Sequence, residues 1–203
     1  MTTVGSTAWN PDADMAEVLI TEEQLAQRVV ELGAQITADY AGQRLLLLGV
    51  LKGAVLFLVD LARQIKLSLE IDFMAISSYG ASTQSSGIVR ILKDLEASVE
   101  GQHILVVEDI VDSGLTLDYL LRSLAARGPA SINVCGLLVK ERERELTVPI
   151  AYTGFTVPDK FVVGYGLDYA ERYRNLPYIG VLKRSVYQQA ATELPSDDSP
   201  IPG

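Results

Sequence analysis

Apolar residues follow two patterns along the chain, continuous runs and helical spacing, and the two patterns alternate from segment to segment. Near-continuous apolar runs, which are typical of strands covered on both faces, occur at residues 45–50, 104–108 and 132–139. Shorter strands are expected at residues 71–76, 88–91, 152–157 and 161–163. Apolar residues at helical spacing predict three helices, at residues 21–40, 54–65 and 116–127. Strands that alternate with helices predict an α/β fold with a doubly wound, mostly parallel sheet.

The two ends of the chain lack either pattern. Residues 1–16 and 193–203 are rich in small, polar and proline residues, and we expect both segments to be disordered tails. Residues 17–192 are then expected to form one domain, with room for a small appended subdomain. Within the helix expected at 54–65, we place Leu56, Val59 and Ala62 on the inward face.

Charge and composition exclude several classes of protein. A net charge of −9 argues against a nucleic-acid surface, because binding a phosphate backbone needs Lys and Arg. No apolar stretch reaches the roughly 18 residues of a membrane span, and no signal peptide is recognised, so the cytosol is the expected compartment. Cys135 is the only cysteine and is expected to be buried and inert, and His103 is the only histidine. A disulfide, a zinc cluster and a histidine-activated nucleophile are therefore not expected.

Acidic and small polar residues follow the central apolar run directly. Glu108, Asp109 and Asp112 come first, and the sequence Ser-Gly-Leu-Thr at 113–116 then opens a helix. A strand, a turn and a helix N-terminus form an anion site, because free N–H groups and the helix dipole face one point. Acids beside such a site suit a ligand that carries a phosphate, a diol and a metal ion, as phosphoribosyl pyrophosphate (PRPP) does. The alternative is an ordinary turn capped by Ser and Thr.

Three charged residues that could bind a ligand or transfer a proton lie just past the ends of expected strands. They are Lys52, Asp112 and Lys140. Because ligands of doubly wound sheets bind at the carboxyl ends of the strands, we expect these side chains to lie at one edge of the sheet.

Four blocks of the sequence occur in the order found in a known family. They are Leu-Lys-Gly-Ala at 51–54, Ser-Ser-Tyr-Gly at 77–80, the acidic block at 106–117 and the segment 157–169. The chain, from about Val18 to Tyr187, resembles the type I phosphoribosyltransferases, and in detail their 6-oxopurine (hypoxanthine–guanine) branch. The resemblance implies that a small hood subdomain is built from both ends of the chain.

The resemblance also implies an activity and its ligands. The expected reaction transfers 5-phosphoribosyl from PRPP to N9 of hypoxanthine or guanine, giving IMP or GMP and pyrophosphate, with Mg²⁺ as cofactor. A homodimer or homotetramer is expected, with no nucleic-acid partner and no membrane. Two rivals remain: a relative that uses another base, such as xanthine or uracil, and a nucleotide-sensing regulatory protein on the same fold. The presence of Asp112 and the negative net charge favour the enzyme.

The resemblance also implies which residues bind the sugar phosphate of PRPP. The 5′-phosphate is expected to bind Ser113, Gly114, Leu115 (through its N–H alone) and Thr116. Glu108 and Asp109 are expected to bind the ribose hydroxyls, directly or through Mg²⁺. Since neighbouring residues of a strand face opposite ways, both acids can reach one ribose only where the strand is ending. Asp112 is the expected proton-transfer group.

The remaining roles concern pyrophosphate, purine and a lid. Pyrophosphate is expected at Leu51, Lys52, Gly53 and Arg174, with a cis peptide between Leu51 and Lys52. A mobile lid is expected at residues 77–87, with Ser78 and Tyr79 at its hinge. The purine is expected to meet Lys140 at O6, the ring of Phe161 and the backbone of Val162, while Asp168 supports a second Mg²⁺ and the pyrophosphate. Without the resemblance, a core aromatic is nearly as good an interpretation of Phe161, and a surface residue is the better interpretation of Arg174.

Overall fold

The protein is described by a computed structural model that covers residues 9–78, 89–141 and 148–187. Its main sheet has six strands in the order β4-β3-β2-β5-β6-β7. They are β2 (Leu45–Leu51), β3 (Leu69–Ser78), β4 (Val89–Lys93), β5 (His103–Val111), β6 (Ser131–Lys140) and β7 (Tyr152–Val157). Neighbouring strands are parallel, except that β4 runs antiparallel to β3 at the edge.

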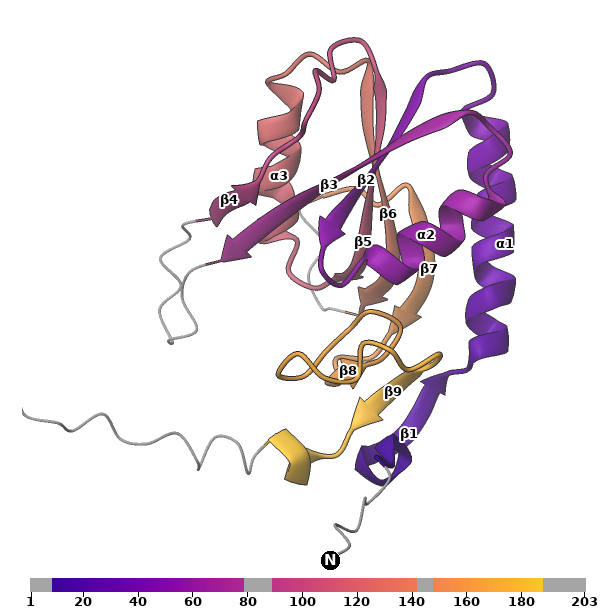
Figure 1. The fold of residues 1–203 in the computed structure, drawn as a ribbon, viewed down its shortest axis with the longest axis vertical. Coiled ribbons are helices and arrows are strands. Elements are labelled where there is room, and N and C mark those ends of the chain that lie inside the picture. Colours follow the sequence, from indigo (N-terminus) through magenta and orange to yellow (C-terminus); the bar gives the residue numbers. More distant parts are fainter. Residues whose placement is uncertain (1–8, 79–88, 142–147, 188–203) are drawn as a thin grey trace, which may run out of the picture.

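Helices cover both faces of this sheet. α1 (Glu22–Asp39) and α2 (Val55–Gln64) lie on one face and α3 (Leu115–Ala125) on the other (Figure 1). Alternate residues of β5 divide between two cores, because side chains of a strand alternate in direction. Leu105 and Val107 pack in the core under α1 and α2, whereas Ile104 and Val106 pack under α3. The doubly wound, mostly parallel sheet predicted from the sequence is therefore confirmed.

The helix boundaries lie within two residues of those expected from the sequence. Thr21 caps α1 through a capping box, in which Thr21 and Gln24 each bind the other's backbone N–H. The inward face of α2 was assigned wrongly at Leu56 and Val59, which are each 39% exposed, whereas Ala62 is half-buried and packs against the core as expected. The fully buried residues of α2 are Phe57, Leu58 and Leu61. The helix is apolar nearly all round, so its period alone does not select the face that meets the sheet.

A second, smaller sheet is built from both ends of the domain. It pairs β1 (Met15–Ile20), β9 (Ile179–Leu182) and β8 (Val162–Val163) in antiparallel order β1-β9-β8, below the main sheet in Figure 1. The small sheet corresponds to the hood implied by the family resemblance.

The N-terminal tail expected at 1–16 ends earlier than residue 16. A 3₁₀ helix (Pro11–Asp14) precedes β1, and Met15 is buried. Tyr173 and Tyr178 donate hydrogen bonds of 2.7 Å to Asp14 and Asp12 and so fasten this segment to the chain before β9. Residues 1–8 and the tail expected at 193–203 lie outside the described residues. Across the described ranges, no helix is both long and apolar enough to span a membrane.

Candidate functional site

The end of β5 and the start of α3 enclose a small cavity of about 110 Å³. It is lined by Glu108, Ile110, Val111, Asp112, Ser113, Gly114, Thr116 and Leu117. Five of these residues were singled out in the sequence for phosphate, ribose or proton chemistry. Leu115 is not among them and is 64% exposed, which fits a role through its backbone only. We call residues 108–116 the β5 end.

Gly114 sets the geometry of this turn. It is the N-cap of α3 and has a φ of 75°, in the left-handed region that favours glycine. The helix therefore begins at Leu115, one residue before the predicted start. The backbone N–H groups of its first turn have no partner within the helix, and they lie beside Ser113 and Thr116 at the positive end of the helix dipole. Such a turn can bind a phosphate.

The two adjacent acids face opposite sides of the sheet. β5 was expected to end at Glu108, but it pairs with β6 as far as Val111, opposite Val139, so that expectation is wrong. Glu108 lines the cavity beside α3. Asp109 points the other way, where a methyl group at Gly53 would overlap its Oδ2 atom. One acid therefore borders the phosphate turn, and the other borders the segment expected to bind pyrophosphate.

Both acids are poorly solvated. Burial, and then the charge of Asp109, raises the pKa of Glu108 well above its usual value. Burial likewise raises the pKa of Asp109. A cation close by would offset the cost of two charged carboxylates, and Mg²⁺ is commonly held by one or two carboxylates together with phosphate oxygens. Each carboxylate is a suitable ligand for this ion, Glu108 on the side of α3 and Asp109 on the side of Gly53.

Asp168 does not join these two acids in one metal centre. Its Oδ1 atom lies 2.7 Å from Nη2 of Arg174. Within the described parts of the chain, no three Asp, Glu, His or Cys side chains are grouped closely enough to hold a metal ion. The three acids named as metal ligands are therefore divided between the β5 end and the loop at residues 164–176.

The segment expected to bind pyrophosphate contacts this 164–176 loop. The Leu51–Lys52 peptide is cis, as the family resemblance implied. Nζ of Lys52 lies 3.0 Å from Oε2 of Glu171, and Nη2 of Arg174 lies 3.4 Å from the same oxygen. The two cations assigned to pyrophosphate thus meet at one carboxylate. Sequence reasoning missed Glu171, because it stands in a run of charged residues that looks like a solvated surface.

Lys140 lies at the end of β6, beside the β5 end. Its Nζ atom is 2.6 Å from Oδ1 of Asp159 and 3.9 Å from Oδ2 of Asp112. The Lys140 side chain is only 16% exposed. The structure therefore places the expected O6 reader next to the expected proton-transfer group. Asp159 was not singled out in the sequence, although it lies in the segment quoted for the family.

The aromatic part of the expected purine site belongs to the hood. Phe161 is 43% exposed, and the ring of Tyr187 stacks on it with centroids 5.2 Å apart. Tyr169 meets the same ring edge-on at 5.8 Å. Val162 is buried in β8, which pairs with β9. The contact with Tyr187 could not be predicted from local sequence, because 26 positions separate it from Phe161.

The expected lid falls largely outside the described residues. Ser78 is the last residue of β3, whereas Tyr79 and the positions up to 88 are not described.

Cys135 is fully buried, and burial raises the pKa of its thiol to about 12, which confirms the expectation of an inert cysteine.

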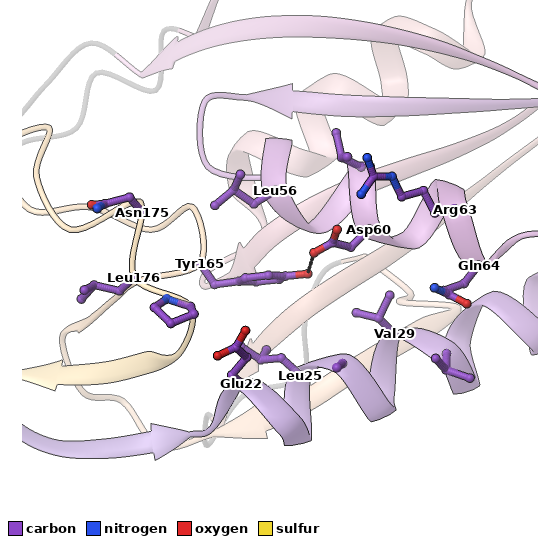
Figure 2. A pocket seen from close by; sticks show the side chains of 14 residues that line it. Glu22, Leu25, Val29, Leu56, Asp60, Arg63, Gln64, Tyr165, Asn175 and Leu176 are labelled. Carbon is purple, nitrogen blue, oxygen red and sulfur yellow. Dashed lines mark hydrogen bonds between the residues drawn. The ribbon is translucent and has the colours of Figure 1, made fainter.

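A larger cavity, of about 540 Å³, lies between α1, α2 and residues 175–177 (Figure 2). None of the site residues expected from the sequence lines it. Most of the residues expected to bind the sugar phosphate line the smaller cavity at the carboxyl edge of the sheet instead.

The main sheet, the hood and the cavity at the carboxyl end of β5 together define a type I phosphoribosyltransferase fold. The chain belongs to the phosphoribosyl transferase domain family, which it matches over residues 17–170. It is 57% identical to a hypoxanthine-guanine phosphoribosyltransferase of Mycobacterium avium over 182 residues, covering 87% of this chain and 90% of that protein. It is 55% identical to the enzyme of the same name from Bacillus subtilis (strain 168), covering 86% and 97%. The crystal structure of a hypoxanthine phosphoribosyltransferase from Staphylococcus aureus matches with a TM-score of 0.83 and 47% identity, covering 87% and 96%.

Proposed function

We propose that this protein is a purine-salvage enzyme that transfers 5-phosphoribosyl from PRPP to N9 of hypoxanthine or guanine, releasing IMP or GMP and pyrophosphate. The observation that carries the proposal is the cavity at the β5 end, with Lys140 3.9 Å from Asp112 at its border. Relatives that are 55–57% identical over most of the chain bear the name of this activity.

The sugar phosphate of PRPP is assigned to the β5 end. The hydroxyls of Ser113 and Thr116 and the N–H groups around Gly114 and Leu115 bind the 5′-phosphate. Glu108, on the cavity side, accepts hydrogen bonds from the ribose hydroxyls. Asp109, on the other side of β5, faces Gly53 and so lies toward the leaving group. The opposite orientation of the two acids lets them bracket the sugar carbon at which the reaction takes place.

The purine is assigned to the space between Lys140 and Phe161. The Lys140 ammonium donates to O6, the Phe161 ring stacks on the base, and the backbone of Val162 meets the edge of the purine. As N9 bonds to C1′ of the ribose, the bond from C1′ to the pyrophosphate oxygen breaks. Asp112 accepts the proton that the purine loses and returns it in the reverse reaction.

The leaving pyrophosphate is assigned to Leu51, Lys52, Gly53 and Arg174. Glu171, which contacts both cations in this structure, has to yield them to the phosphate oxygens. Glu108 and Asp109 would hold Mg²⁺, and Asp168 would support a second ion through the pyrophosphate. The metal would neutralise the negative charge that develops on the leaving group.

The test is release of pyrophosphate from PRPP with hypoxanthine, guanine, xanthine, adenine and uracil in turn. We expect turnover with the first two bases and none in excess EDTA with PRPP stripped of metal. Tight binding of nucleotide without turnover of any base would instead favour a regulatory protein. Light scattering of the same preparation measures the oligomer, for which we propose a homodimer or homotetramer.

A further inference from the structure

A buried tyrosine and an aspartate join two segments that lie far apart in the sequence. Tyr165, in the 164–176 loop, is 8% exposed, and its hydroxyl donates a hydrogen bond of 2.7 Å to Oδ2 of Asp60 in α2. Figure 2 shows the bond crossing from the loop to the helix beside the larger cavity. Burial, and then the carboxylate of Asp60, raises the pKa of the Tyr165 hydroxyl, which therefore stays a donor at physiological pH.

Each of the two segments carries part of the proposed pyrophosphate site. α2 begins at Val55, two residues after Gly53, so it continues directly from Lys52 and Gly53. The loop carries Arg174, whose Nη1 atom donates to the carbonyl of Gly166 at 2.7 Å. The hydrogen bond between Tyr165 and Asp60 therefore joins α2, which follows Lys52, to the loop that carries Arg174.

The loop is also seated directly on the backbone of the pyrophosphate segment. Gly166 has a φ of 105°, and a methyl group there would overlap the carbonyl oxygen of Gly53. The N–H of Gly166 donates to the carbonyl of Arg174 at 2.9 Å. Because Tyr165 precedes Gly166, a shift of the Tyr165 ring moves the point at which the two segments touch.

We propose that Tyr165 and Asp60 are positioning residues for the pyrophosphate site, and that their hydrogen bond holds Lys52 and Arg174 at the spacing the ligand requires. This inference rests on the proposed function. Neither residue touches substrate, so both act through the two segments that they join. Loss of the bond is expected to weaken binding of PRPP and pyrophosphate while leaving Asp112 and Lys140, at the ends of β5 and β6, in place.

The chain contains a matched control for this pair. The hydroxyl of Tyr152 donates to Oδ2 of Asp39 at 2.8 Å, and Tyr152 is 6% exposed. Tyr152 begins β7 and Asp39 ends α1, so this pair joins α1 to β7 and involves neither α2 nor the 164–176 loop. Tyr→Phe at either position removes one buried hydroxyl from a carboxylate, but only one of the two pairs adjoins the pyrophosphate segment.

The experiment measures steady-state kinetics of wild type, Tyr165→Phe and Tyr152→Phe in both reaction directions. For Tyr165→Phe we expect KM for PRPP and for pyrophosphate to rise about fivefold, the affinity equivalent of one typical net hydrogen bond. KM for hypoxanthine and kcat should stay within about twofold. Tyr152→Phe should leave all four parameters unchanged, although thermal stability falls in both variants.

Substitutions of Asp60 supply the second arm. Asp60→Asn keeps an oxygen that accepts from Tyr165 and should retain the wild-type KM for PRPP, whereas Asp60→Leu should match Tyr165→Phe. Equal KM values for PRPP in Tyr165→Phe and Tyr152→Phe, or an equal rise for hypoxanthine and PRPP, would overturn the proposal. If Tyr165→Phe does not fold, the comparison of KM for PRPP between Asp60→Asn and Asp60→Leu tests the proposal in its place. Failure of the proposed function is seen separately, as wild type without PRPP-dependent turnover.

Discussion

The β5 end follows regular backbone, whereas the 164–176 loop does not. At the β5 end a strand leads into a helix, and the left-handed residue is Gly114, with a φ of 75°. The loop contains two glycines of positive φ and four other residues that share this conformation. The four are Tyr165 (φ 48°), Ala170 (φ 51°), Glu171 (φ 61°) and Tyr173 (φ 74°).

The contrast separates two ways of building a binding site. A left-handed residue other than glycine costs about 1–3 kcal/mol, and it persists only where neighbouring contacts hold it. Here the contacts are backbone hydrogen bonds, from Tyr165 to Leu176 and between Gly166 and Arg174, each 2.9 Å long. The β5 end contributes reactive side chains on an ordinary scaffold. The loop contributes a backbone shape that places Asp168 and Arg174.

The largest effect is expected at the β5 end, from Asp112→Asn. The change keeps the size of the side chain and removes the proposed proton acceptor, so kcat should fall by roughly 10²–10⁴ while PRPP still binds. Steady-state kinetics measure kcat, and calorimetric titration with PRPP measures the affinity for PRPP. The control is Asp118→Asn on α3, where Asp118 pairs with Arg122 at 2.6 Å. A kcat within threefold of wild type would remove Asp112 from the proposed chemistry.

The same contrast explains how much of the molecule could be predicted from its sequence. The three central strands, β2, β5 and β6, were found because each carries an apolar run, and the three outer strands were found from shorter apolar segments. The acids at Glu108 and Asp109 stood out against the apolar run of β5, and the turn at Ser113 and Gly114 followed them in sequence. Chemistry carried by side chains at the end of a regular strand is thus visible as a local pattern.

The loop and the hood left no comparable pattern. β9 has only four residues, and β1 is half exposed without strict alternation, so neither produces a period. The contacts of Glu171 with Lys52 and of Tyr165 with Asp60 each join positions more than 100 residues apart. Such contacts depend on the tertiary fold and on the backbone conformation of the loop. The family resemblance supplied Arg174 and Asp168 there, but not the residues that position them.

An intermediate effect is expected in the loop, from Gly166→Ala. The added methyl group would overlap the carbonyl of Gly53, and the φ of 105° is unfavourable for alanine, so the two segments must move apart. KM for PRPP should rise about ten- to a hundredfold, the equivalent of about 1–3 kcal/mol, with a smaller change for hypoxanthine.

A matched glycine separates backbone strain from this overlap. Gly42 has a φ of 77° and open space around its Cβ position, so Gly42→Ala introduces strain without a clash. It should lower the melting temperature and leave KM for PRPP unchanged. A similar KM for PRPP in both variants would show that the contact between Gly166 and Gly53 does not shape the pyrophosphate site.

The smallest effect is expected where the purine site borders the β5 end, from Lys140→Gln. An ammonium can only donate, so it favours the O6 acceptor of hypoxanthine over the 6-amino group of adenine, whereas glutamine can donate or accept. The ratio of kcat/KM for hypoxanthine to that for adenine should fall about tenfold, the equivalent of about 1.4 kcal/mol. Lys93→Gln, which breaks a comparable pair with Asp72 at 3.0 Å, should leave the ratio unchanged. If the ratio holds in Lys140→Gln while kcat falls for both bases, Lys140 acts on Asp112, 3.9 Å away, and base choice belongs to the hood.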